Sequence, residues 1–258
     1  MSENSHGLTQ TSRYLIVLIM GAALLLGGMA LGTGSNAGAA AAKKAKKSKI
    51  LGNVGAMPDA RCPADCSGLA IVTGFQAEID GVGNVYRVPY NGKITRWKIS
   101  LGKPTKSQRS FFQSRFGKKP KAGISVVKPV TVNGNKRYKL IKRSPVEGLN
   151  KYMGKQTWIE LNNAIDVRKG QYVALTVPTW ATALGARYVM KDGKIEKDSG
   201  GNAILDDDFS WRASRERNNC GTPNFKNSAP QTELGSKFEY GCRFYGGQLL
   251  YRVKVVGN

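Results

Sequence analysis

The sequence predicts an all-β fold, an antiparallel jelly-roll-like β-sandwich with one short helix, preceded by an N-terminal hydrophobic helix. Glycine is abundant, with 31 of the 258 residues, and β-branched and aromatic residues are spread along the chain. Short segments of alternating apolar and polar residues recur between turn signals, which is typical of strands in a sandwich or barrel. Because no helical stretch is long enough to connect parallel strands, we expect the sheets to be antiparallel.

The N-terminal segment is hydrophobic. Residues 14–32 are 19 apolar or small residues in a row, and Arg13 precedes them. Residues 37–39 have the sequence Ala-Gly-Ala, an A-x-A pattern suited to signal peptidase. The hydrophobic length lies between that of a signal-peptide core and that of a minimal membrane span. We therefore interpret residues 1–39 as a signal peptide or a single-span membrane anchor, which predicts an extracellular or cell-surface location. If the segment is retained, the membrane is an expected partner.

Residues 40–61 are predicted to be a basic linker rich in Ala and Lys, and residues 62–258 a β-sandwich domain. Five lysines lie close together in the linker: Lys43, Lys44, Lys46, Lys47 and Lys49. Positive charge beside a hydrophobic segment favours the cytoplasmic side, so this cluster is an argument against export. Without an apolar face, residues 39–49 are expected to stay solvated, either as a spacer or as an attachment to an anionic surface.

Alternating or β-branched runs predict the strands of the domain. They are residues 69–78, 84–88, 93–101, 124–128, 136–143, 155–161, 171–177, 187–190 and 248–256. The segment 171–177 is apolar or small on both faces, which indicates a strand at the centre of the fold. It is expected to end at Pro178, in a loop that presents Trp180 at the surface.

Three shorter patterns add detail to these strands. Gly74 interrupts the first strand and indicates a β-bulge. On the strand at residues 93–101, Trp97 shares a face with two aliphatic residues, so we expect it in the core. Three phenylalanines within residues 107–116 follow a helical spacing, which predicts a short helix that ends at Gly117.

The cysteines favour disulfide bonds. Cys62, Cys66, Cys220 and Cys242 are even in number and follow a predicted export signal. We expect the pairs Cys62–Cys66 and Cys220–Cys242, because each pair is close in sequence and encloses chain rich in turns. The alternative is a zinc site formed by all four, although its usual signature is two C-x2-C pairs and the spacings here are different.

Catalytic and metal-binding patterns are scarce. The single histidine, His6, precedes the predicted domain, which therefore lacks Ser-His-Asp or Cys-His catalysis and any histidine-ligated metal. Residues 206–208 are three aspartates without calcium-loop spacing, which we interpret as a solvated acidic loop. The carboxylates on or near predicted strands are Glu78, Glu160, Glu233 and Glu239. Since no pattern brings two of them together across a cleft, we predict no catalytic residue, no metal site and no cofactor.

Several segments together resemble one group of proteins. They are SQRSFFQSRFG, ISVVKP, QYVALTVPTW, WRASR and LLYRV, in this order, with Cys220 and Cys242 between the last two. The series resembles a group of uncharacterised secreted actinobacterial proteins over residues 62–256. The resemblance implies export, a β-sandwich and paired cysteines. Because no activity is assigned to that group, it implies no catalytic or binding residue. The basic linker and the acidic excursion at residues 192–208 are not typical of the group.

Basic residues are concentrated in one half of the predicted domain. Residues 93–169 contain 20 Lys and Arg against three acidic residues, a net charge of +17, whereas residues 187–216 have a net charge of −1. Such density adds repulsion to the bare fold, so it indicates either a solubilising surface or a surface that binds a polyanion. The expected binding residues are Arg96, Lys98, Lys118, Lys119, Lys121, Lys139 and Arg143.

Trp180 and Trp211 are predicted to lie near the surface as aromatic platforms that can stack on sugars or nucleobases. Our first hypothesis is a non-enzymatic cell-envelope module that binds an acidic glycan or another anionic polymer. The alternatives are a secreted polysaccharide hydrolase and an extracellular nucleic-acid-binding module. Two carboxylates that converge in the largest groove would favour the hydrolase. A flat basic face beside an exposed Trp or Tyr would favour binding.

Overall fold

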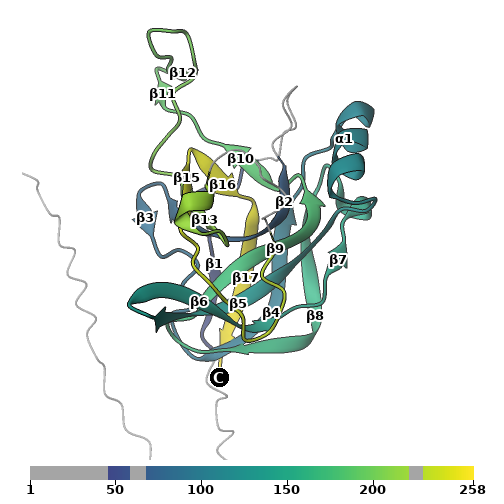
Figure 1. Ribbon diagram of the computed structural model, residues 1–258, viewed down its shortest axis with the longest axis vertical. Helices are drawn as coiled ribbons and strands as arrows, with labels where there is room; N and C mark the ends of the chain where they lie inside the picture. The colour runs from purple at the N-terminus through teal and green to yellow at the C-terminus, as the bar shows by residue number, and fades with distance from the viewer. Residues whose placement is uncertain (1–45, 59–67, 221–228) are drawn as a thin grey trace, which may run out of the picture. The chain divides into compact units, whose positions relative to one another are not determined.

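The computed structural model describes residues 46–58, 68–220 and 229–258 (Figure 1). The fold is mostly β, with antiparallel sheets that curl and one short α-helix. The predicted N-terminal hydrophobic helix lies outside the described residues, as do Cys62 and Cys66. Within the described residues, no helix is both long enough and apolar enough to span a membrane.

Two large antiparallel sheets contain most of the strands. The smaller of the two has the order β1 (Ser48–Leu51), β17 (Tyr251–Gly257), β4 (Gly92–Ser100) and β8 (Gln156–Val167). The larger has the order β14 (Lys237–Phe238), β6 (Asn135–Arg143), β5 (Lys121–Val132), β9 (Tyr172–Ala181), β2 (Leu69–Ile79), β13 (Ser210–Ala213) and β15 (Cys242–Tyr245). On its flanks, β3 (Val82–Gly83) pairs with β2, and β7 (Glu147–Gly148) pairs with β5.

The remaining elements are short. Two strand pairs join β10 (Leu184–Ala186) to β16 (Gly247–Leu249) and β11 (Met190–Lys191) to β12 (Lys194–Ile195). The helix is α1 (Lys106–Phe116), and two 3₁₀ turns are η1 (Asn150–Tyr152) and η2 (Arg217–Asn219). The β11–β12 hairpin projects from the sheets, as expected for the acidic excursion (Figure 1).

Both large sheets bury apolar side chains in one core. The smaller sheet contributes Ile94, Trp97, Ile99, Val253 and Val255, and the larger contributes Val72, Ile124, Val126, Val173, Leu175 and Val177. Each fully buried aliphatic side chain stabilises the fold by about 1.5–3 kcal/mol relative to an exposed one. The prediction that Trp97 lies in the core is confirmed, because its side chain is completely buried.

The central position predicted for β9 is also confirmed, since this strand lies between β5 and β2. The prediction of where it ends is wrong. β9 continues through Pro178 to Ala181. Pro178 lacks a backbone N–H and is tolerated because β5 pairs only as far as Thr176, while the pairing with β2 is interrupted by a bulge between Ala70 and Val72. Trp180 therefore belongs to a strand rather than a loop.

The predicted linker at residues 40–61 overlaps with the sheet. β1 begins at Ser48 and pairs with β17 in antiparallel register. Leu51, at its end, is 1% exposed and packs in the core, whereas Lys46, Lys47 and Lys49 are exposed. Ile50 is half-buried and Leu51 is buried, so the residues that directly follow the lysine run belong to a strand of the sheet.

The helix predicted at residues 107–116 is confirmed as α1. Thr105 caps its N-terminus: its hydroxyl accepts from the backbone N–H of Gln108, whose side chain accepts from the N–H of Thr105. Gly117 ends the helix with φ of 109°, a conformation that favours glycine. Phe112 is buried and Phe111 is 51% exposed, so the helix covers the sheets with one face only.

Two other details differ from the sequence-based expectations. The register of β2 shifts between Ala70 and Val72 against β9 and between Gln76 and Glu78 against β13, rather than at Gly74. Gly74 instead allows Trp211 to pack closely, because a Cβ at this position would lie 2.9 Å from a ring carbon of Trp211. The predicted last strand is divided into β16 and β17 at Leu250, whose backbone N–H donates to Ala183 outside either large sheet.

Candidate functional site

The outer face of the four-stranded sheet, which has the order β1-β17-β4-β8, carries four cations in two cross-strand rows. Because side chains alternate along a strand, the burial of Trp97 and Val253 turns their neighbours outward. Arg252 of β17 lies directly opposite Lys98 of β4, and Lys254 lies directly opposite Arg96. Arg96 and Lys98 were among the predicted binding residues, whereas Arg252 and Lys254 were not.

Trp158 of β8 extends one of these rows, because it pairs with Lys98 on the other side of β4. The guanidinium carbon of Arg96 lies 4.6 Å from the centroid of the Trp158 ring. Trp158 is partly exposed, whereas the other three tryptophans, Trp97, Trp180 and Trp211, are at most 8% exposed. We call Arg96, Lys98, Arg252, Lys254 and Trp158 together the basic sheet face.

The cations of the basic sheet face are only partly neutralised. Arg96 forms a 3.1 Å ion pair with Glu160, which lies opposite it on β8. Arg252 donates a 2.7 Å hydrogen bond to the carbonyl of Gly55. Among the described residues, Lys98 and Lys254 have no hydrogen-bond or ion-pair partner. The face therefore keeps an excess of positive charge beside an aromatic ring.

The structure does not bring the other predicted polyanion-binding residues to this face. Lys118, Lys119 and Lys121 are exposed between α1 and the start of β5. Lys139 of β6 lies on the larger sheet, in a row formed with Lys128 of β5 and Lys237 of β14. The seven predicted residues thus occupy separate regions of the surface.

Arg143 lies in a groove with a volume of about 620 Å³, which Glu147 and Glu160 also line. Glu160 is held by Arg96, so this groove adjoins the basic sheet face. A larger groove, of about 870 Å³, is lined by Lys128, Lys142, Arg168 and Lys169 and by a single carboxylate, that of Asp166.

Asp166 is surrounded by positive charge. Lys142 Nζ lies 2.9 Å from one of its oxygens, and Lys93 Nζ lies 3.8 Å from the other. The hydrogen bond from Lys142 and the charges of both lysines lower the pKa of this carboxyl below its ordinary value. The larger groove therefore presents cations with one ionised acid.

The carboxylates considered for hydrolysis lie at different places. Glu78 forms an ion pair with Arg243, and Glu239 accepts a 3.4 Å hydrogen bond from the backbone of Arg217. Glu233 is exposed in the turn before β14. Among the described residues, no group of three or more His, Cys, Asp or Glu side chains could hold a metal ion.

The prediction that Trp180 lies at the surface is wrong. Its side chain is completely buried, stacks on Phe112 with ring centroids 5.1 Å apart, and donates a 2.8 Å hydrogen bond to the carbonyl of Gly117. Trp211 is only 8% exposed and stacks on Phe244 at 4.8 Å. Trp180 is buried because β9 continues where the sequence pattern indicated a loop, and Trp211 is buried on β13, which lies between β2 and β15.

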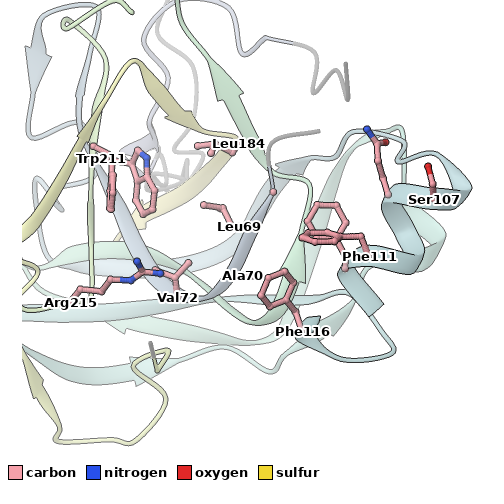
Figure 2. Close-up of a pocket in the computed structure, with 13 residues that line it drawn as sticks. Leu69, Ala70, Val72, Ser107, Phe111, Phe116, Leu184, Trp211 and Arg215 are labelled. Carbon is pink, nitrogen blue, oxygen red and sulfur yellow. The ribbon is translucent and has the colours of Figure 1, made fainter. Parts of the chain in front are cut away.

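Trp211 nevertheless lines an apolar pocket with a volume of about 670 Å³ (Figure 2). Its other apolar wall residues come from β2, α1, β10 and β15: Leu69, Ala70, Val72, Phe111, Phe112, Phe116, Leu184 and Phe244. Gly68 and three polar residues, Ser107, Gln108 and Arg215, complete the wall. Trp180 supports this apolar pocket from behind, through its stacking on Phe112.

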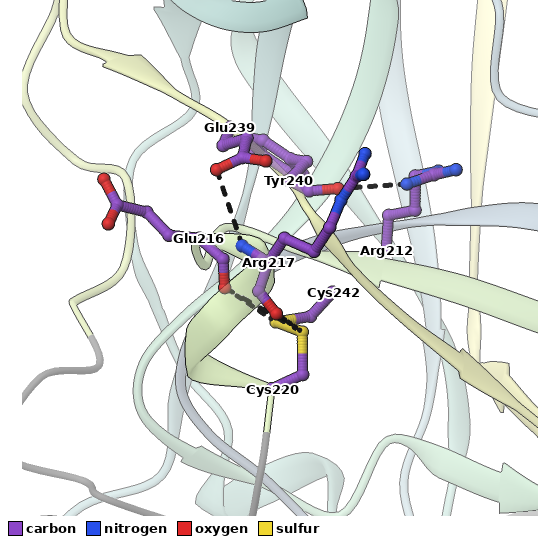
Figure 3. The surroundings of a disulfide bond; sticks show 7 residues. All are labelled: Arg212, Glu216, Arg217, Cys220, Glu239, Tyr240 and Cys242. Atoms are coloured by element: carbon purple, nitrogen blue, oxygen red, sulfur yellow. Dashed lines mark hydrogen bonds between the residues drawn. A yellow bond between two sulfur atoms is a disulfide. The ribbon is translucent and has the colours of Figure 1, made fainter.

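The predicted disulfide between Cys220 and Cys242 is confirmed, with Cα atoms 5.2 Å apart (Figure 3). It joins the end of η2 to β15. Nearby, Arg212 donates a 3.2 Å hydrogen bond to the carbonyl of Tyr240, which fixes the chain before β15 against β13. A zinc site that uses all four cysteines is contradicted, because these two are bonded to each other.

Comparisons of this chain with models of known protein families, with curated proteins and with solved structures find no match.

Proposed function

We propose that this chain is an exported or membrane-anchored, non-enzymatic module of the cell envelope that binds an acidic glycan or another anionic polymer through the basic sheet face. We also propose that its two large sheets form a jelly-roll-like β-sandwich, in which one sheet presents this face outward. The observation that carries the proposal is the pairing of Arg252 with Lys98 and of Lys254 with Arg96, beside the partly exposed Trp158.

The placement of these cations is unfavourable for the fold alone. Like charges directly opposite each other on paired strands destabilise a sheet by about 0.2–1 kcal/mol. Glu160 offsets only one of the four charges by an ion pair. An anionic ligand would remove the remaining repulsion, so binding and stability would be linked.

Trp158 adds an apolar surface to the electrostatic attraction. Its ring can pack against the carbon face of a sugar, while the cations of the neighbouring strands β4 and β17 bind carboxylate or sulfate groups. This combination favours an acidic polysaccharide. A nucleic acid shares the polyanion chemistry and can stack bases on the same ring.

The test compares two variants of equal net charge. In the first, Arg96, Lys98, Arg252 and Lys254 are replaced by Gln. In the control, four exposed lysines elsewhere are replaced by Gln: Lys106, Lys118, Lys119 and Lys121. Retention is measured on heparin, on a polyuronate and on isolated cell walls, across a range of salt concentrations.

We expect the first variant to elute at much lower salt than the unmodified protein, and the control to elute close to it. Equal losses in both variants would mean that total charge, rather than the basic sheet face, determines binding. Competition by a DNA duplex stronger than that by the polyuronate would favour the nucleic-acid alternative.

The hydrolase alternative has one supporting observation, the presence of Glu147 and Glu160 in the same groove. Incubation with the retained polysaccharide, followed by measurement of reducing ends, tests it. Release of reducing ends that is lost in the variant Glu147→Gln would replace the binding proposal with an enzymatic one.

A further inference from the structure

Arg215 is a cation in a largely apolar environment, and among the described residues no anionic side chain pairs with it. It lies in the segment that follows β13, and its side chain is only partly exposed. Its Nε atom is buried, and within the described residues the guanidinium has no hydrogen-bond or ion-pair partner. Burial lowers the pKa of this group below its ordinary value. A partly buried guanidinium without an anionic partner is costly to the fold, and a ligand with an anionic group would offset this cost.

The pocket around Arg215 indicates the shape of such a ligand. Arg215 lines the apolar pocket together with Trp211, Phe244 and Val72. Figure 2 shows the guanidinium beside Val72, with Trp211 near it and with Phe111 and Phe116 of α1 at the far end. The volume of about 670 Å³ falls within the range of about 300–1,000 Å³ that is usual for pockets with a bound small molecule.

The backbone holds Arg215 firmly in this position. Its N–H donates a 2.7 Å hydrogen bond to the carbonyl of Ala213, and its carbonyl accepts a 2.7 Å hydrogen bond from Gly241. Gly241 directly precedes Cys242, which the disulfide joins to Cys220. The cation is therefore attached to a cross-linked framework and needs little reorganisation to receive a ligand.

We propose that the apolar pocket binds an amphiphile with an extended apolar chain and a terminal anion, whose anionic group pairs with Arg215 and whose chain lies along Trp211, Leu184 and the phenylalanines of α1. Fatty acids and single-chain phospholipids share this chemistry. The site is separate from the basic sheet face, because none of its lining residues belongs to β1, β17, β4 or β8.

The experiment uses cis-parinaric acid, a fluorescent fatty acid, and competition by saturated fatty acids of increasing length. We expect saturable binding, with an affinity that rises about fourfold for each added methylene until the chain fills the pocket. A lysophosphatidic acid and a fatty acid of the same chain length then distinguish a phosphate from a carboxylate as the preferred anion.

Variants locate the site. Arg215→Gln should weaken binding of the fatty acid by about tenfold to hundredfold and leave binding of the fatty alcohol of equal length unchanged. Arg215→Lys should retain most of the affinity for the acid, and Leu184→Trp, which fills the pocket, should abolish binding of both compounds. The matched control Arg217→Gln removes an exposed cation two residues away and should have no effect.

A merely structural role for Arg215 would affect acid and alcohol alike. The proposal is overturned if the acid binds Arg215→Gln as well as it binds the unmodified protein, or if no fatty acid of any length binds. The four-site Gln variant of the basic sheet face should still bind the fatty acid at high salt, so failure of the polyanion proposal and failure of this one are distinguishable.

Discussion

The guanidinium of Arg96 lies over the ring of Trp158 while it also forms an ion pair with Glu160. The ion pair orients Arg96, and the guanidinium packs against the indole, which stays partly exposed. Cation–π contacts at exposed positions contribute about 0.5–1 kcal/mol. The ring is therefore ordered before any ligand arrives.

The first prediction concerns the fluorescence of Trp158. Since the other three tryptophans are at most 8% exposed, Trp158 should account for most of the fluorescence that acrylamide can quench. The variant Trp158→Phe should lose this quenchable fraction, and an acidic glycan should protect it in the unmodified protein. Quenching that is the same with and without a bound glycan would contradict the role of this ring.

The second prediction is a difference in stability between two tryptophans. Trp180→Ala should lower the free energy of unfolding by about 3–5 kcal/mol, because it leaves a cavity behind Phe112 and an unpaired carbonyl at Gly117. Trp158→Ala should lower it by about 1 kcal/mol at most. Urea denaturation of both variants provides the comparison, and equal losses would count against the two assigned environments.

The third prediction separates stability from binding on the basic sheet face. Lys254→Gln removes a charge that lies opposite Arg96, so the free energy of unfolding should stay equal or rise by up to about 0.5–1 kcal/mol. Retention on heparin should fall in the same variant. Lys118→Gln, at an exposed position away from this face, is the control for both measurements. A destabilised Lys254→Gln variant would show that the fold itself needs this charge.

The fourth prediction concerns alkaline unfolding. Burial raises the pKa of Tyr86, Tyr240 and Tyr251 above the ordinary value of 10.0. Above about pH 10 the unfolded chain loses protons that the folded chain keeps, so this contribution to stability is complete below pH 10 and is lost as the pH rises. The three groups together give a slope of about −4 kcal/mol per pH unit.

Urea denaturation at several alkaline pH values measures this slope, and Tyr251→Phe should reduce it by about a third. Because these hydroxyl groups stay protonated in the folded state, part of the tyrosinate absorbance should appear only on unfolding. Full tyrosinate absorbance in a protein that is still folded would contradict the burial of the three side chains.

The local pattern of the sequence predicted the orientation of side chains correctly where one face of a strand is buried. Alternation placed Trp97 inside and Lys98 outside, and β4 confirms both. The same reasoning fails for Trp180, because a proline within an apolar run predicts the end of a strand. Pro178 is tolerated beyond the last pairing with β5, beside a bulge in β2, and neither feature has a signal in the local sequence.

The composition of the candidate sites depends on long-range pairing. Lys98 and Arg252 are far apart in the chain, and only the register of β4 with β17 brings them together. Arg215 ends the WRASR segment, for which the sequence pattern predicts no binding role. Its isolation in an apolar pocket depends on α1 and β10, which no spacing rule connects to it.

The register between β4 and β17 also determines the distances between the four cations. Adjacent strands lie about 4.8 Å apart, and residues on one face repeat about every 6.8 Å along a strand. The Cα atoms of Arg96, Lys98, Arg252 and Lys254 thus mark the corners of a small rectangle. A shift by one residue would turn Arg252 and Lys254 into the core, so the buried valines between and beside them keep this rectangle fixed. The hydrophobic core therefore fixes the distances between the four cations. If the basic sheet face binds an anionic polymer as proposed, we expect it to prefer linear polymers whose anions recur about every 5–7 Å over compact anions that contact one cation at a time.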